Sequence, residues 1–210
     1  LNISAWEKYS FIYSDSDPNL LAQITWGFPT GVMDSSALSV PFTNHTSARR
    51  HPEIVQDYVN KHLQSKAIYG PFDRNPLDQD IIVSPLQVAF SKPRVCNDLS
   101  YGDMSVNSQI PDEWEKYPGY SGDLSLPCID DVVEVILDLG PGCMLFKTDF
   151  SAYYKQLSTD PGDISTLAFA YGGKIYFEAP LPFGLRSSCL NAQRVTVPSF
   201  SSTIIKPSHS

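Results

Sequence analysis

Residues 51–70 carry the clearest hydrophobic pattern in the chain. Their apolar side chains recur three and four positions apart, at Ile54, Val55, Tyr58, Val59 and Leu63. That spacing places side chains on one face of a helix. Pro52 suits the first helical position, and Gly70 and Pro71 should end the element. The pattern therefore predicts an amphipathic helix with one buried face.

Two later stretches have the same helical character. In residues 129–139 one face is apolar and the first turn is acidic, at Asp130 and Asp131, and Gly140 should stop the helix. After residue 184, the apolar residues Leu185, Leu190 and Val195 predict a last helix, for which Ser187 or Ser188 can serve as the N-cap. The apolar face of the helix predicted in residues 129–139 consists of Ile129, Val132, Val133, Ile136 and Leu137.

Strand-like patterns lie between these helices. Residues 81–90 contain a β-rich apolar run, then Pro85, then alternating apolar positions, which predicts an interrupted or edge strand. The apolar run in residues 143–150 predicts a short strand that ends on Asp149. The β-rich runs on either side of Gly172-Gly173 predict a hairpin with a two-residue turn.

The order helix, strand, helical turn, hairpin and helix predicts an α+β fold, with helices covering one face of a small antiparallel sheet. Residues 1–44 show no sustained hydrophobic period, so we interpret them as an irregular N-terminal segment with at most short elements. Residues 198–210 are a Ser- and Pro-rich, low-complexity tail. No internal repeat is visible.

Charge changes this picture only in part. The chain has 210 residues and a net charge of -8, which argues against a freestanding nucleic-acid binder, because affinity for phosphate backbones depends on Lys and Arg. The acidity is uneven, however. Residues 1–140 carry 9 basic and 19 acidic side chains, whereas residues 141–197 carry 5 and 4. The segment with the sharpest motifs is therefore nearly neutral.

The sequence contains no run of eighteen apolar residues and no signal-peptide pattern, so we expect an intracellular protein of the cytoplasm or nucleus without a membrane partner. Its first residue is Leu, which is consistent with a fragment of a longer protein. The four cysteines lack C-x-x-C spacing and predict reduced thiols rather than zinc ligands or disulfides. They are Cys96, Cys128, Cys143 and Cys189.

Asp149 is the first candidate for chemistry. A carboxylate at the end of a buried strand is costly unless it is paired, hydrogen-bonded or bound to a cation. Periodicity alone favours a structural role, in which Asp149 caps a helical turn beginning near Ser151 or pairs with Lys147 or Lys155. A metal-binding role is the alternative.

Two other short patterns could contact a ligand. Pro182 and Gly184 bracket Phe183 in a turn before a helix, where another molecule could approach the backbone closely. Lys92 and Arg94 lie on the same side of an extended backbone and could grip a triphosphate. Taken alone, the Pro-Phe-Gly turn is a weak signal that also fits an ordinary strand-to-helix connection, and an isolated Lys-Arg pair is more typical of solvated surface charge.

Read together, these motifs resemble the fingers and palm of a reverse transcriptase, most closely those of DIRS-type retroelements, which also encode a tyrosine recombinase. On this resemblance residues 45–128 are a fingers-like region and residues 129–197 a partial palm. Six stretches match in the family's order. They are HPEIVQDYVNKHLQSKAIYGPF (51–72), VSPLQVAFSKPRVCNDLSY (83–101), SVNSQIP (105–111), DDVVEVILDLGPGCMLFKTDFSAYYKQL (130–157), GGKIYFEAPLPFGLRSS (172–188) and LNAQR (190–194).

The resemblance implies a role for Asp149 as a catalytic carboxylate that binds two Mg²⁺ ions, with Mn²⁺ as a substitute. The backbone carbonyl of Phe150 would complete one coordination sphere. Tyr154 matches the aromatic residue that excludes a ribose 2′-hydroxyl and so selects deoxynucleotides.

The same resemblance places Phe183 and Gly184 against the nascent base pair, and Lys92 and Arg94 on the incoming triphosphate. Asn191 or Gln193 would face the primer-template. The implied partners are an RNA or DNA template-primer and deoxynucleoside triphosphates.

The chain also departs from the family pattern. Only Pro93 separates Lys92 from Arg94, Tyr153 replaces a small residue, and Cys189 replaces a proline. No aromatic-x-Asp-Asp motif follows residue 197, and thumb, RNase H and recombinase segments would lie elsewhere in a full-length polyprotein. We therefore expect DNA synthesis by two-metal nucleotidyl transfer in the intact family, but an inactive chain in isolation. The alternative is a non-catalytic relic or a domesticated interaction module.

Overall fold

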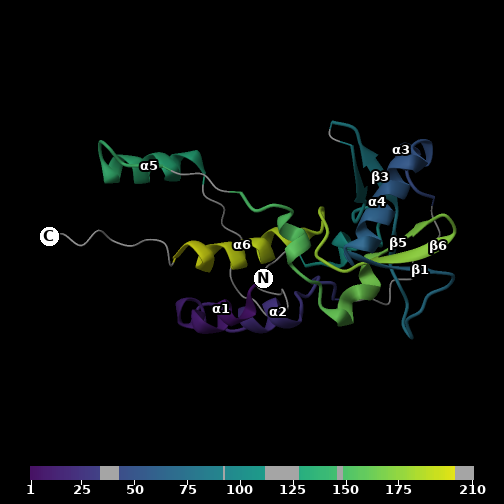
Figure 1. Ribbon diagram of the computed structural model, residues 1–210, viewed down its shortest axis with the longest axis horizontal. Helices are drawn as coiled ribbons and strands as arrows, with labels where there is room; N and C mark the ends of the chain where they lie inside the picture. Colours follow the sequence, from purple (N-terminus) through teal and green to yellow (C-terminus); the bar gives the residue numbers. More distant parts are fainter. Residues whose placement is uncertain (34–42, 92, 112–127, 146–148, 202–210) are drawn as a thin grey trace.

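The computed structural model describes residues 1–33, 43–91, 93–111, 128–145 and 149–201. The strands lie at one end of the molecule with helices α3 (Thr46–Arg50) and α4 (Pro52–Gln64) (Figure 1). Helix α6 (Arg186–Ser201) extends away from that end, alongside α1 (Ile3–Lys8) and α2 (Leu20–Trp26). The order of short helices, strands and a long last helix confirms the α+β class.

Four strands form the larger sheet, in the order β1 (Ile68–Phe72), β6 (Lys174–Glu178), β5 (Ala168–Tyr171) and β2 (Val83–Ser84). The pairs β1–β6 and β6–β5 are antiparallel, whereas β2 runs parallel to β5. The sheet is therefore mixed, and not purely antiparallel as the sequence pattern predicts. A parallel neighbour needs a long connection, and here residues 85–167 provide it.

The predicted hairpin is confirmed. Strands β5 and β6 pair from Ala168↔Phe177 to Tyr171↔Lys174, which leaves Gly172 and Gly173 as a two-residue turn. Both glycines have positive φ, +59° and +72°, as a type I′ turn requires. This local signal was sufficient because a two-residue loop fixes the register of the strands that it joins.

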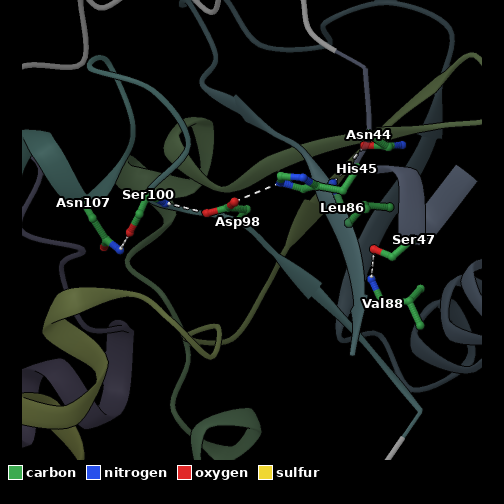
Figure 2. Close-up of polar contacts among 8 residues, drawn as sticks. All are labelled: Asn44, His45, Ser47, Leu86, Val88, Asp98, Ser100 and Asn107. Carbon is green, nitrogen blue, oxygen red and sulfur yellow. Dashed lines mark hydrogen bonds and ion pairs between the residues drawn. The ribbon is translucent and has the colours of Figure 1, made fainter. Parts of the chain in front are cut away.

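Pro85 divides the interrupted strand between two sheets. Strand β2 ends before it, and β3 (Leu86–Ala89) begins after it and pairs with β4 (Arg94–Asn97) in a separate antiparallel sheet. Side chains cover the outer edge of β3 in Figure 2: Asn44 Oδ1 accepts from the Leu86 N–H at 2.8 Å, and Ser47 Oγ from the Val88 N–H at 3.0 Å. The edge is thus protected from pairing with another chain.

Helix α4 is confirmed, but its predicted end is wrong. The helix stops at Gln64, and Gly70 and Pro71 lie within β1. Lys66 adopts φ +57°, a left-handed conformation that more often falls to glycine, and the chain then turns into the sheet. The sequence gives no warning of this turn. The predicted buried face is correct, because Val55 and Val59 are fully buried.

The buried residues form two clusters. One joins α3 and α4 to β1, β3, β4, β5 and β6, through residues such as Val55, Leu86 and Phe169. The other joins the N-terminal segment to the region after residue 157, through Leu20, Phe28, Leu157 and Leu181. Residues 1–33 contain only short elements, as the sequence predicts, yet they supply core side chains.

Helix α5 (Ile129–Leu139) has its predicted bounds but not its predicted packing. In the first turn, Asp131 Oδ2 accepts from the Cys128 N–H at 2.6 Å. This bond, together with a bond to the Cys128 side chain, lowers the pKa of the Asp131 carboxyl. The apolar face is exposed, with Ile129 at 81% and Leu137 at 74%. In Figure 1 the helix projects away from both sheets. The amphipathic spacing correctly predicted an apolar face on α5, but spacing alone does not specify which element packs against that face.

The segments around Asp149 and the start of α6 also differ from expectation. The described residues of the predicted strand, 143–145 and 149–150, have no regular secondary structure, and 146–148 lie outside the described residues. Neither Ser187 nor Ser188 caps α6. Their hydroxyls instead donate to the carbonyls of Thr30 and Pro182, because both serines are buried inside the fold. Helix α6 continues to Ser201, through Pro198.

All four cysteines are free thiols, as predicted. In the part of the chain that the structure describes, no helix combines the length and apolar character that crossing a membrane would need.

Candidate functional site

A row of aromatic rings connects the Asp149 segment to the Pro-Phe-Gly turn. Phe150 stacks on Tyr153 with ring centroids 4.5 Å apart, and Tyr153 lies 6.4 Å from Tyr154. Tyr154 meets Phe183 edge-to-face at 4.8 Å. Residues that lie 29 positions apart in the sequence, 154 and 183, therefore form one surface. Edge-to-face pairs of this kind are geometrically specific as well as apolar.

Helix α6 holds this row of rings in place. A short 3₁₀ helix, η4 (Tyr153–Gln156), carries the two tyrosines and follows Ala152, whose φ is +49°. The Tyr153 hydroxyl donates to the carbonyl of Ala192 at 2.9 Å and lies 2.8 Å from the Thr196 hydroxyl. Tyr153, which replaces a small residue in the family pattern, is thus anchored to α6.

Tyr154 is also tied to α6. Burial raises its pKa, and the neighbouring Cys189 thiol raises it further. Cys189 is the residue that departs from the family's proline, and its position in α6 lets it contact this tyrosine.

Asn107 fixes the turn that carries Phe183. Gly184 has φ +88°, a conformation that side chains disfavour. Its carbonyl accepts from Asn107 Nδ2 at 2.8 Å, and Asn107 Oδ1 accepts from the Arg186 N–H at 2.8 Å. One amide thus satisfies both sides of the junction between the turn and the first residue of α6, where helix N–H groups lack intrahelical partners.

A chain of hydrogen bonds extends from Asn107 through Ser100 and Asp98 to His45, as Figure 2 shows. Asn107 Nδ2 donates to Ser100 Oγ at 2.8 Å, and the Ser100 N–H donates to Asp98 Oδ1 at 3.2 Å. Asp98 Oδ2 lies 2.9 Å from His45 Nε2. The sequence did not single out Asn107 or Asp98. Apart from Ser100, their partners lie 53 to 79 positions away, so no local spacing could have identified them.

Replacing Asn107 tests this arrangement. Asn107→Ala removes all three hydrogen bonds and should destabilise the chain by about 1–3 kcal/mol, at roughly 1 kcal/mol per bond. Asn107→Asp keeps the acceptor for the Arg186 N–H but loses the donor to Gly184. We expect amide exchange at Arg186 to accelerate in the alanine variant and to stay slow in the aspartate variant. Equally fast exchange in both would contradict the assigned contacts.

Beside the turn lies a cavity of about 530 Å³ between α4, β4 and Phe183. Arg94, at the start of β4, and the half-exposed Phe183 both line it. The structure thereby brings together two residues that the family resemblance assigned to the same nucleotide. Cavities of this size with aromatic walls and a few charged groups are typical of small-molecule sites.

The cavity is also lined by a buried charged cluster that sequence reasoning missed. Glu178 is 2% exposed, and its carboxylate contacts Lys155 Nζ at 2.7 Å and the Tyr58 hydroxyl. Burial raises the pKa of Tyr58 far above its usual range, and Glu178 adds to that effect. Burial lowers the pKa of His62, whose ring packs against Tyr58, and Lys155 lowers it further. His62 is therefore neutral at physiological pH.

Asp149 itself is exposed, next to the aromatic row. The 3₁₀ helix begins at Tyr153 after Ala152, so Asp149 does not occupy its capping position. Lys155, one of its predicted ion-pair partners, contacts Glu178 instead, and Lys147 lies outside the described residues. The structural roles that the sequence favoured for this carboxylate, as far as the described residues test them, are thus not observed.

The described residues do not complete a two-magnesium site. Within the described ranges, no three His, Cys, Asp or Glu side chains gather in a group that could hold a metal ion. Asp149 and the Phe150 carbonyl supply oxygen donors of the kind that Mg²⁺ prefers. One carboxylate does not match the donor set that two divalent ions need.

The remaining predicted site residues lie as follows. Lys92 is outside the described residues. Asn191 is completely buried in α6, where its Oδ1 accepts from Arg194 Nη1 at 2.9 Å. Gln193 is half-buried on the same helix. In this structure Asn191 therefore serves the core, and its side chain does not reach a surface where a nucleic acid could contact it.

Comparisons with known proteins support the fold. No protein-family model and no curated protein matches the chain. Among solved structures, the native prototype foamy virus protease-reverse transcriptase has a TM-score of 0.54 at 15% identity, over 84% of this chain and 21% of that one. The foamy viral protease-reverse transcriptase dRH in complex with double-stranded DNA has a TM-score of 0.51 at 13% identity, over 83% and 27%.

At these identities the similarity concerns the fold alone. The chain thus has a reverse transcriptase-like fold and spans about a quarter of the length of the proteins that it matches.

Proposed function

We propose that this chain is the fingers and partial palm of an RNA-directed DNA polymerase from a DIRS-type retroelement. The observation that carries the proposal is the contact between Tyr154 and Phe183 beside a cavity that Arg94 also lines. Phe183 and Arg94 line this cavity, and Tyr154 contacts Phe183 next to it. Family resemblance assigns these three residues, from separate sequence motifs, to the incoming nucleotide, and this supports the proposal. The reverse transcriptase-like fold is consistent with this assignment.

Each of these residues would contact a different part of the nucleotide or of the template-primer. Arg94, and Lys92 beside it, would bind the triphosphate through charge-assisted hydrogen bonds. Tyr154 would block a ribose 2′-hydroxyl, and Phe183 with Gly184 would lie against the nascent base pair. Gln193 would approach the primer-template from α6. The substrates would be deoxynucleoside triphosphates on an RNA or DNA template-primer.

Asp149 and the Phe150 carbonyl would provide part of a magnesium site, for which Mn²⁺ can substitute. A divalent ion bound there would neutralise triphosphate charge. The other carboxylates of a two-metal site would have to come from outside these residues. We therefore propose that this chain binds nucleotide and metal weakly and does not complete nucleotidyl transfer by itself.

Photolabelling tests the proposal without requiring catalysis. A photoactivatable deoxynucleoside triphosphate, added with Mn²⁺, should label peptides that contain Tyr154 or Phe183. Asp149→Asn should reduce the Mn²⁺-dependent labelling by at least about tenfold, because it removes a direct ligand, and loss of a residue that only supports a metal ligand already costs about 10–100-fold. Free Mn²⁺, followed by electron paramagnetic resonance, should rise in parallel because the variant binds less of it.

The matched control is Asp138→Asn, which removes another exposed carboxylate, on α5. It should leave labelling and Mn²⁺ binding unchanged. A wild-type chain that neither binds Mn²⁺ nor takes up label at these peptides would overturn the proposal. Equal loss in the two variants would remove Asp149 as a metal ligand.

A non-catalytic interaction module is the second candidate, and helix α5 favours it. Its exposed apolar face is the kind of surface that marks a contact with another macromolecule. This candidate predicts no Mn²⁺-dependent labelling at Tyr154 or Phe183. The photolabelling experiment therefore separates the two functions.

A further inference from the structure

The Glu178 carboxylate lies where three structural elements meet. Glu178 is the last residue of β6. Its Oε1 accepts from the Tyr58 hydroxyl of α4 and from Asn97 Nδ2 of β4, the latter at 3.5 Å. Its Oε2 contacts Lys155 Nζ of η4. One buried side chain thus joins a helix, the smaller sheet and the aromatic segment to the larger sheet.

The same elements carry the residues assigned to the nucleotide. Lys155 directly follows Tyr154, Asn97 lies three residues after Arg94 on β4, and Glu178 lies five residues before Phe183. Glu178, Lys155, Asn97 and Phe183 all line the cavity of about 530 Å³. A shift of these partners around the carboxylate would therefore change the cavity wall that Phe183, the ring partner of Tyr154, shares with Arg94.

Paired charges fix geometry more narrowly than apolar packing does. Apolar burial is non-directional, whereas an ion pair with little access to water is favourable only when its geometry is good and its other lone pairs are satisfied. The Lys155 side chain is 20% exposed and the Glu178 side chain 3%. The carboxylate also accepts from two further donors. The cluster is thus well suited to set a distance between elements.

We propose that Glu178 is a positioning residue, which sets the Tyr154–Phe183 pair at its distance from β4 through Lys155, Tyr58 and Asn97. The nucleotide role of that pair rests on the proposed function, but the positioning itself does not. Glu178 touches none of the groups that would react. It acts through the side chains that it holds.

The reactivity of Cys96 reports on the Glu178–Lys155 ion pair. Its thiol lines the same cavity. Burial raises its pKa, Arg94 lowers it, Glu178 raises it, and Lys155 lowers it. Glu178→Gln should therefore speed alkylation of Cys96, and Lys155→Met should slow it, because the thiolate is the reactive form. General loosening would speed alkylation in both variants, so opposite changes identify the charges.

The position of Phe183 is measured by ¹⁹F NMR on the full chain labelled with 4-fluorophenylalanine. The Phe183 resonance is assigned from its absence in Phe183→Leu. We expect it to shift in Glu178→Gln and in Lys155→Met, and to return close to its wild-type position in Lys155→Arg, which keeps the charge. Peptide mapping of alkylated Cys96 is done on the same samples.

The matched control is Lys174→Met, which breaks the exposed ion pair with Asp73. It should leave the Phe183 resonance and Cys96 alkylation unchanged. A folded Glu178→Gln with an unshifted Phe183 resonance would overturn the proposal. If Glu178→Gln does not fold, Tyr58→Phe replaces it as the test, because it removes only the hydroxyl that contacts Glu178. A shifted Phe183 resonance in Tyr58→Phe would support positioning by Glu178, and an unshifted resonance would refute it. Neither readout uses a nucleotide, so either proposal can fail while the other stands.

Discussion

Asp17→Ala should destabilise the chain by about 3–5 kcal/mol, the usual cost of removing one partner from a buried ion pair. Asp17 Oδ2 accepts from Arg194 Nε at 2.7 Å, and Asp17 Oδ1 from Arg194 Nη2 at 2.9 Å. The Arg194 side chain is only 1% exposed. Its guanidinium cannot lose its proton, so the variant must keep this charge in the core without the Asp17 carboxylate beside it, or expose it by local unfolding.

Urea unfolding measures this loss, and Asp15→Ala is the matched control. Asp15 is exposed two residues away on the same segment, and its truncation should change the free energy of unfolding by no more than about 0.5 kcal/mol. The double variant Asp17→Leu/Arg194→Met should recover most of the stability, because an apolar pair can replace a buried ion pair. Near-equal effects of Asp17→Ala and Asp15→Ala would show that water reaches Arg194.

The Asp17–Arg194 pair gives the N-terminal segment a role. Residues 1–44 received no functional interpretation from the sequence. In the structure, Leu20 and Phe28 belong to the core that supports α6, and the buried Asp17 pairs with Arg194 of that helix. The Thr30 N–H donates to Asp163 Oδ2 at 2.6 Å. The segment thus stabilises the helix that anchors Tyr153. Its contribution is to the framework, and it acts on the candidate site through α6.

Local signals predicted the elements whose structure is decided locally. The Gly172-Gly173 turn selects one hairpin register, and the spacing from Ile54 to Leu63 selects one helix face. The predicted end of α4 was wrong because Lys66, and not a glycine, adopts the left-handed conformation after the helix. The prediction of a purely antiparallel sheet was wrong because β2 pairs in parallel with β5. That pairing depends on contacts between residues about 85 positions apart.

The candidate site shows the same division. Tyr154 and Phe183 could be identified from family resemblance, and the structure places their rings in contact. Asn107 and Glu178 could not, because an asparagine in a loop and a glutamate at a strand end have ordinary local patterns. Asn107 bonds to Gly184, 77 positions away, and Glu178 to Tyr58, 120 positions away. Residues that hold a site together are thus harder to predict than residues that would touch its ligand.

Gly27→Ala should also cause a large loss, about 3 kcal/mol or more, because it combines backbone strain with a collision. Gly27 has φ +121°, and a Cβ there would lie 2.4 Å from the Thr159 carbonyl oxygen and 2.6 Å from the Asp160 N. Both atoms belong to backbone, which no rotamer change can move away. The next residue, Phe28, is fully buried and pairs with the same segment, its N–H donating to the Ser158 carbonyl at 2.8 Å.

Gly102→Ala separates the two causes. Gly102 also has positive φ, +78°, but a Cβ there would meet no atom within 4 Å. This control should lose only the conformational cost, about 1–2 kcal/mol, whereas Gly27→Ala should also lose protection from amide exchange at Phe28 and Asp160, whose N–H groups bond across this contact. Equal losses of stability in the two variants would mean that residues 158–160 can move aside, and that the N-terminal segment is held there by its side chains alone.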